Sequence, residues 1–233
     1  MKVHNVEQRS PEWYALRAGI PTASEFSRLI TSDGSPSKQS QAYAMELAAE
    51  KFAGRPVDAF TGNAWTERGQ ELESAAIKLY RFARDVDVEK VGFVTDDAGT
   101  MGCSPDGLVG VDGMVEVKCL KADNHIKAIL YFQKHGRAPT DHVQQTQGQL
   151  LICERAWCDL IFYHPELPFL VIRQHPIPDV FRAIRQEVQA IGLVRDQLLN
   201  ALRLQEGAET ASPAIKPPPL PIATDFNKTA PVF

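Results

Sequence analysis

The chain has 233 residues, of which 44% are hydrophobic and 23% are charged, with a net charge of -4. This length suits one domain of about 200 residues, and the composition argues against wholesale disorder. No apolar run approaches the roughly 18 residues that a spanning helix needs, and the first thirty residues lack a signal-peptide core. The net negative charge argues against a protein that coats nucleic acid non-specifically. We therefore expect a soluble, cytoplasmic protein.

The spacing of the four cysteines and the absence of several motifs exclude further classes of protein. No two cysteines are spaced as in a zinc ribbon or a thioredoxin motif, so we interpret them as reduced and mostly structural. The sequence contains no GxGxxG, P-loop, GxSxG or HExxH motif. Their absence argues against the commonest dinucleotide, nucleotide-triphosphate, hydrolase and zincin chemistries.

The N-terminal third has the spacing of helices. Ser10 and Pro11 start a helix that Gly19 ends, and the capping-box spacing of Thr22 and Glu25 predicts a second helix from about Ala23. Apolar residues recur at helical spacing over residues 40–53 and again over residues 65–83.

The middle of the chain changes to short β-branched runs. These predict strands over 91–95, 107–111, 114–119, 157–164 and 169–174, with helices over 142–153 and 178–204. The sequence Asp112-Gly113 predicts a tight hairpin. We expect an α/β fold with a central mixed sheet of about five strands flanked by helices.

The composition shifts after residue 206. Residues 207–233 hold six of the 16 prolines, so we expect a single domain over 1–206 followed by a proline-rich tail. Proline excludes a helix or a central strand there, and the tail is either disordered or laid on a surface as an extended arm.

The predicted hairpin carries the most informative charges. Side chains alternate along a strand, so Glu116 and Lys118 point to one face, and the turn brings Asp106 beside them. Carboxylate oxygens are ligands that Mg²⁺ prefers, and a lysine beside such an ion can activate an attacking water. The alternative is an exposed charged strand face. We favour the site, because a charged pair among Val115, Val117 and Cys119 is costly unless it is used.

These residues resemble a known family. Pro105-Asp106 with Glu116-Val117-Lys118 is similar to the PD-(D/E)xK nuclease motif. The wider match is to lambda-exonuclease-type phage recombination nucleases, the YqaJ-like viral recombinases. It rests on Trp13–Glu25, Gly69–Glu73, Cys103–Leu108, Glu116–Cys119 and Gln145–Gln147, in the family's order over roughly residues 9–155.

The resemblance implies a restriction-endonuclease-like core and a Mg²⁺-dependent 5′-to-3′ exonuclease. Such an enzyme would degrade one strand of linear double-stranded DNA by a two-metal mechanism, release 5′-mononucleotides and leave 3′ overhangs. Mn²⁺ is a plausible substitute for Mg²⁺. The resemblance also implies a homotrimeric ring, a single-strand-annealing recombinase as partner, and a phage or prophage gene expressed in a bacterial host.

The resemblance also assigns roles to individual residues. Metal ligands would be Asp106, Glu116, the main-chain carbonyl of Val117, and Glu73, which holds the second ion or its water. Lys118 would orient the nucleophilic water, with Gln147 helping. The terminal 5′-phosphate would contact Arg17, Thr22, Ser24 and Ser104. The first three also suit an anion on chemical grounds, as a guanidinium and two hydroxyls beside a helix N-terminus.

Several assignments stay open at this point. Glu73 is either a ligand or a solvated helix charge, and the active-site glutamine is either Gln145 or Gln147. Where the family has an arginine, this chain has Asn124, with Lys121 and His125 as candidate substitutes. Trp65 is either a core residue or a wedge at the duplex end. Two other functions stay open: an endonuclease on the same scaffold, and a DNA-end-binding module with little catalysis.

Overall fold

The computed structural model describes residues 1–57 and 64–211. Its α-helices are α1 (Pro11–Arg17), α2 (Ser40–Ala53), α3 (Ala64–Arg84), α4 (Ala122–His135), α5 (Val143–Cys153) and α6 (Pro178–Ala211). Two short 3₁₀ helices are η1 (Ala23–Arg28) and η2 (Thr140–His142). The strands are β1 (Lys2–His4), β2 (Phe93–Thr95), β3 (Gly102–Cys103), β4 (Gly107–Val109), β5 (Gly113–Cys119), β6 (Trp157–Tyr163) and β7 (Leu170–Gln174).

The strands form two sheets. A small antiparallel sheet has the order β1-β2-β3, and a larger mixed sheet has the order β4-β5-β6-β7. In the larger sheet β5 runs antiparallel to β4 and parallel to β6. The predicted hairpin is therefore present, with Gly107 opposite Val115, but its turn comprises residues 110–112, and Gly113 belongs to β5 opposite Val109.

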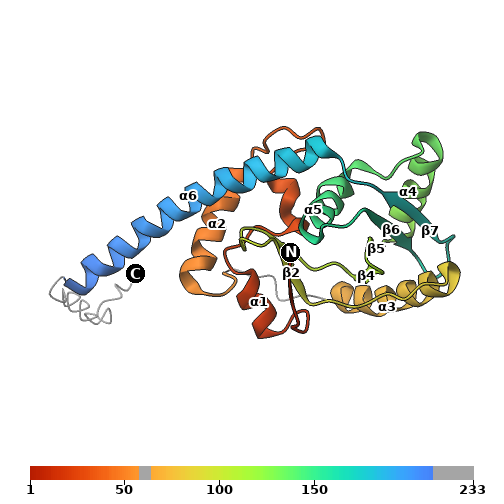
Figure 1. The fold of residues 1–233 in the computed structure, drawn as a ribbon, viewed down its shortest axis with the longest axis horizontal. Helices are drawn as coiled ribbons and strands as arrows, with labels where there is room; N and C mark the ends of the chain where they lie inside the picture. The colour runs from red at the N-terminus through yellow and green to blue at the C-terminus, as the bar shows by residue number, and fades with distance from the viewer. Residues whose placement is uncertain (58–63, 212–233) are drawn as a thin grey trace, which may run out of the picture.

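Helices cover both faces of the larger sheet (Figure 1). On one face, Val115 and Val117 of β5 pack with Ala76 and Tyr80 of α3. On the other face, Met114 shares a core with residues of α5, of η1 and of the long helix α6. Because both faces are covered, β5 is buried over its first five residues. A charged side chain on this strand therefore meets protein rather than open water.

The α/β fold class and most predicted elements are confirmed, with differences at short or weakly patterned segments. Strands β1 and β3 were not predicted, because three and two residues are too few to show alternation. Helix α4 was not predicted either, although His125, Ala128 and Phe132 recur at helical spacing on its packed face. The segment after Thr22 is a 3₁₀ helix rather than an α-helix.

The last helix is longer than predicted. It continues through Gly207 to Ala211, past the residue where we expected the tail to begin. The remaining tail, residues 212–233, lies outside the described part of the chain. No helix within the described ranges combines the length and apolarity that crossing a membrane requires.

Candidate active site

The hairpin brings Asp106, Glu116 and Lys118 together, as the sequence predicts. Asp106 lies just before β4, and its Oδ2 accepts a hydrogen bond of 2.6 Å from the backbone N–H of Val117. This bond ties the Asp106 carboxylate to the middle of β5. Lys118 Nζ donates to Glu116 Oε1 at 2.8 Å. Strand pairing therefore fixes the relative positions of two carboxylates and one ammonium.

Glu116 is the centre of this cluster. Its side chain is only 5% exposed, so it does not belong to a solvated charged strand face. Gln145 Nε2 donates to Glu116 Oε1, and Gln149 Nε2 donates to Glu116 Oε2, both at 2.6 Å. Lys118 Nζ also donates to Gln145 Oε1 at 2.7 Å. Helix α5 therefore supplies the polar partners that make burial of this carboxylate tolerable.

The structure does not bring Gln147 to this cluster. Gln147 is fully buried, its Nε2 donates to the carbonyl of His175, and its Oε1 accepts from the backbone N–H of Ile177. The side chain thus joins α5 to the segment between β7 and α6. Gln145 and Gln149 are four residues apart and share a helix face, whereas Gln147 lies on the other side. This spacing was the sequence signal for both site glutamines.

Glu73 comes from α3 and lines the same pocket as Asp106 and Glu116. Burial raises the pKa of Glu73, and the nearby Lys90 and Arg9 charges oppose that rise. Burial, followed by the charges of Glu116 and Glu73, raises the pKa of Asp106 well above its ordinary value. Carboxylates placed this closely repel one another, so the site favours a cation.

Lys118 is held in its charged form. Burial by itself would lower the pKa of Lys118, but the charge and hydrogen bond of Glu116 and the charge of Asp106 outweigh it, so the pKa rises. Its side chain is 21% exposed. Lys118 is thus oriented by two acceptors and retains contact with solvent.

The four predicted phosphate contacts line one pocket with these carboxylates. The pocket has a volume of about 190 Å³, and its walls include Arg17, Thr22, Ser24 and Ser104. An Arg17 terminal nitrogen donates to Thr22 Oγ1 at 3.3 Å, and Thr22 Oγ1 is 3.3 Å from Ser24 Oγ. A guanidinium and three hydroxyls therefore face a cavity that also reaches Asp106 and Glu116.

Trp13 organises this pocket, a role that our sequence interpretation did not assign. The Arg17 guanidinium stacks 4.0 Å above the Trp13 ring, and Trp13 Nε1 donates to Ser104 Oγ at 2.8 Å. Burial lowers the pKa of Arg17, although the group remains a cation. Within the described residues Arg17 forms no ion pair, so its charge has no carboxylate partner in contact.

The residues present fit a hard divalent cation. No three Asp, Glu, His or Cys side chains form a closed ligand group in the part of the chain that the structure describes. Mg²⁺ does not need one, because it is commonly held by one or two carboxylates with water in its remaining positions. Asp106 and Glu116 supply these carboxylates. Gln149 Oε1, in the wall of the same pocket, is buried without a hydrogen-bond partner and could accept from such a water.

The remaining predicted residues have different surroundings. His125 is fully buried and bonded through Nε2 to the carbonyl of Pro168, so it cannot replace the family arginine on DNA. Lys121 is exposed at the start of α4, and Asn124 Oδ1 accepts from Lys127. The side chain of Trp65 lies outside the described residues. Val117, whose carbonyl was a predicted ligand, is a buried residue of β5.

The fold and this cluster define a restriction-endonuclease-like α/β protein. Residues 12–156 match the YqaJ-like viral recombinase domain, and the chain belongs to that family. No curated protein matches the sequence.

Solved structures agree with this membership. An alkaline exonuclease (LHK-Exo) from Laribacter hongkongensis is 30% identical with a TM-score of 0.74, covering 86% of this chain and 100% of that one. Its complex with dAMP gives 29% identity, a TM-score of 0.73 and the same coverage. A phage-related exonuclease from Haemophilus somnus 129PT has a TM-score of 0.62 at 17% identity, covering 78% and 96%, and this likeness shows the fold alone.

Proposed function

We propose that this protein is a Mg²⁺-dependent exonuclease that removes 5′-mononucleotides from one strand of linear double-stranded DNA. Degradation runs 5′ to 3′ and leaves a 3′ single strand for phage-type recombination by strand annealing. The observation that carries this proposal is the single pocket that holds an anion site, from Arg17 to Ser104, beside the Asp106, Glu116 and Lys118 cluster.

The residues have separate tasks in this proposal. Arg17, Thr22, Ser24 and Ser104 bind the terminal 5′-phosphate and so set which phosphodiester reaches the carboxylates. Lys118, fixed by Glu116 and Gln145, orients the attacking water and places a positive charge next to the phosphate that is cut. Two Mg²⁺ ions, held by Asp106, Glu116, the Val117 carbonyl and Glu73, would when bound stabilise the charge that develops on that phosphate.

The relatives support this reading at the level of chemistry. The exonuclease from L. hongkongensis has been crystallised in complex with dAMP, a nucleoside monophosphate. By the same relationship we propose a homotrimeric ring around DNA, a single-strand-annealing recombinase as partner, and action in the cytoplasm of a bacterial host.

A timed digest of linear duplex DNA tests the function. The substrate carries a label at either the 5′ or the 3′ end, and the reaction is run with and without Mg²⁺. We expect early release of the 5′ label as a mononucleotide, only with Mg²⁺. Lys118→Ala and Asp106→Ala should each reduce the rate by at least about 10²-fold, because each removes a group that acts on the reacting phosphate.

Circular dichroism of both variants provides the control for folding. Full activity in either folded variant would contradict the assigned site. Cutting of closed-circular duplex would instead favour an endonuclease on the same scaffold. Binding of DNA ends without Mg²⁺-dependent nucleotide release would favour an end-binding module.

A further inference from the structure

A second, larger cleft adjoins the catalytic pocket. It has a volume of about 790 Å³ and lies between the segment before α1, helix α3 and residues 88–90. The cleft and the smaller pocket share Gln8, Arg9, Glu73 and Asp106 in their walls. The two cavities therefore meet at the carboxylates, and a chain that occupies one can continue into the other.

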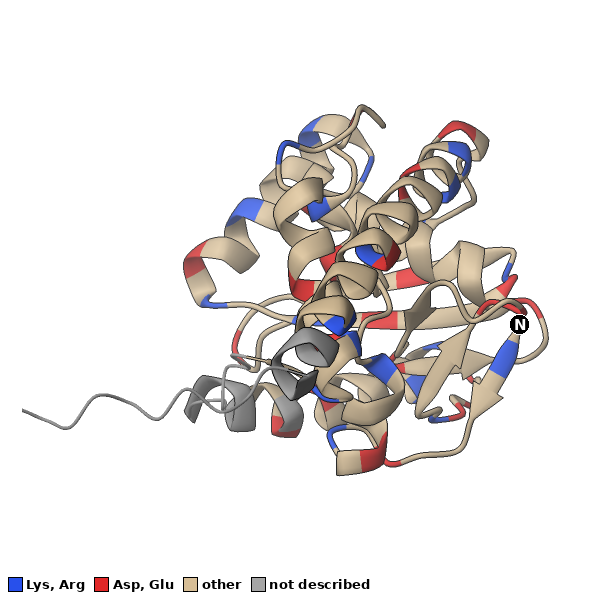
Figure 2. Cartoon of the chain, turned by 90° about the vertical axis from the view of Figure 1, so that its left-hand side faces the viewer, with Lys and Arg blue, Asp and Glu red and all other residues tan. Residues whose placement is uncertain are grey.

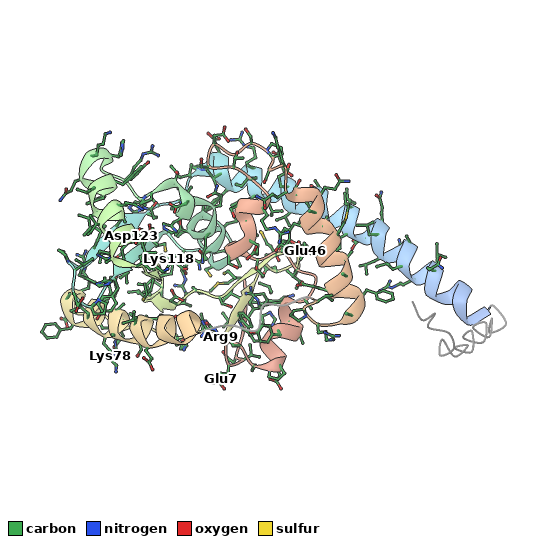
Figure 3. The ribbon with its side chains drawn as sticks, turned by 180° about the vertical axis from the view of Figure 1, so that it is seen from behind. Glu7, Arg9, Glu46, Lys78, Lys118 and Asp123 are labelled. Atoms are coloured by element: carbon green, nitrogen blue, oxygen red, sulfur yellow. The ribbon has the colours of Figure 1, made fainter. Side chains whose placement is uncertain are left out.

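The outer part of this cleft carries three exposed cations. Arg9 comes from the N-terminal segment, Lys78 from α3, and Lys90 from the segment before β2. None of the three forms an ion pair within the described residues, whereas Arg81, farther along the same wall, is paired with Asp87 at 2.6 Å. Figure 3 shows Arg9 beside the start of α3 and Lys78 farther along that helix. These charges are available to an external anion.

Arg9 is held in an unusual backbone conformation. Its φ is +72°, in the left-handed region that residues with a Cβ rarely adopt. Its neighbours fix this geometry: Gln8 donates to the carbonyls of Val91 and Pro105, and Ser10 caps α1. A strained residue kept next to a reacting centre is a reason to look for a function.

The residues of the proposed active site bind only the terminal nucleotide and the phosphodiester that is cut. The nucleotides that follow in the same strand need a binding site of their own. If the terminal nucleotide occupies the smaller pocket, the strand must pass Asp106 and continue beyond Glu73. The cleft wall on α3 runs from Glu73 to Arg81, eight residues or about 12 Å along the helix. A volume of this size matches a small-molecule site rather than a double helix.

We propose that this cleft binds the two or three nucleotides that follow the cut in the degraded strand, as single-stranded DNA. Arg9, Lys78 and Lys90 contact their phosphates. This inference rests on the proposed exonuclease function, because that function places the terminal nucleotide in the smaller pocket. It adds a subsite that selects an unpaired strand of several nucleotides over a mononucleotide.

Calorimetric binding of 5′-phosphorylated deoxyoligonucleotides tests the subsite without relying on activity. All proteins carry Lys118→Ala to prevent digestion, and the probes have one, two, four or six nucleotides. The parent should bind more tightly as the probe grows to about four nucleotides and then level off. Adding Lys78→Gln and Lys90→Gln should leave mononucleotide binding unchanged and remove most of the gain in affinity with length. Adding Arg9→Gly as well, at a residue that also lines the smaller pocket, should remove the rest of that gain. Glycine suits the positive φ of residue 9, so this substitution should not harm folding.

Salt dependence supplies a second readout. Each lost phosphate contact makes the negative slope of log K against log salt shallower by about 0.7 for single strands, so for the triple variant its magnitude on the tetranucleotide should fall by about 2. The matched control removes three exposed lysines outside the cleft, by Lys2→Gln, Lys38→Gln and Lys51→Gln, and should retain the gain with length.

The outcomes separate the two proposals. An unchanged length dependence and salt slope in the triple variant would overturn the cleft assignment, as would a parent that gains nothing with length. If affinity rises with probe length only when a complementary strand is present, the single-strand assignment would be overturned. Failure of the protein with Lys118 intact to digest linear duplex would instead contradict the exonuclease function.

Discussion

Two glutamines of α5 show how a shift of two positions changes the role of a residue. Gln145 bridges Lys118 and Glu116 inside the candidate site, whereas Gln147 bonds the backbone of His175 and Ile177. We therefore assign Gln145, and not Gln147, as the glutamine that helps to position Lys118. This assignment gives the two residues opposite expected phenotypes.

Gln145→Ala should lower the exonuclease rate by about 10²-fold with little change in stability, because Lys118 loses one of its two orienting acceptors. Gln147→Ala should instead lower the free energy of unfolding by about 1–3 kcal/mol, since it removes a fully buried side chain that bonds the His175 carbonyl and the Ile177 N–H. Initial rates and urea unfolding of both variants make the comparison. The reverse pattern would restore Gln147 to the site.

Arg17 is the second residue with a discriminating test. Arg17→Ala should reduce the preference for 5′-phosphorylated over 5′-hydroxyl ends by about 10- to 100-fold, since a charge-assisted hydrogen bond contributes about 1.5–3 kcal/mol. Arg17→Lys keeps the charge but loses the planar fork, so it should recover part of the preference. The ratio of initial rates on the two ends measures this effect. An unchanged ratio in Arg17→Ala would remove Arg17 from the phosphate pocket.

At the scale of elements, the contact between α5 and η1 holds the catalytic pocket together. A Cβ added at Gly148 would lie 2.4 Å from the ring of Phe26, which is fully buried. Helix α5 carries Gln145 and Gln149, and η1 carries Ser24. The missing side chain at Gly148 therefore lets the carboxylate partners and the phosphate pocket approach each other.

Gly148→Ala should destabilise the protein by about 1–3 kcal/mol, although alanine is the better helix former, because the added methyl group forces η1 away. The matched control is Gly192→Ala in α6, where no atom lies within 4 Å of the added Cβ. That variant should be stabilised by up to about 1 kcal/mol. Chemical denaturation of both proteins measures the difference. Equal effects would show that the α5–η1 contact is loose.

At the scale of the whole molecule, exposed apolar side chains suggest surfaces that are covered in an assembly. Phe82 is 88% exposed on α3, and Leu193 and Leu204 are 63% and 76% exposed on α6. Charges of both signs are spread over the helices rather than gathered in one basic block (Figure 2). In this view the described residues present no broad cationic face to duplex DNA, and the proposed ring would supply its channel from three copies.

The proposed trimer has a direct measurement. Light scattering should give about 77 kDa, three copies of the 25.8-kDa chain, across a range of concentrations. Burial of apolar surface drives such association, so the mass should persist at high salt. Phe82→Ser removes an exposed aromatic and should weaken the trimer if α3 lies in the interface. A constant mass near 26 kDa would contradict the ring.

The sequence by itself determined most of the scaffold and named the charged cluster that the structure brings together. Periodicity predicted the helices and strands that build the larger sheet, and alternation along β5 placed Glu116 and Lys118 on one face. The motifs shared with the family also named the residues from Arg17 to Ser104 that line one pocket. Patterns of this kind are readable because each depends on side chains a few positions apart.

Only the tertiary structure decided which distant residues meet. It chose Gln145 over Gln147, added Gln149 and Trp13, and joined the catalytic pocket to the cleft of Arg9, Lys78 and Lys90. These features depend on how α3, α5 and the N-terminal segment pack around β5. Packing joins residues far apart in the chain, so no local pattern records it.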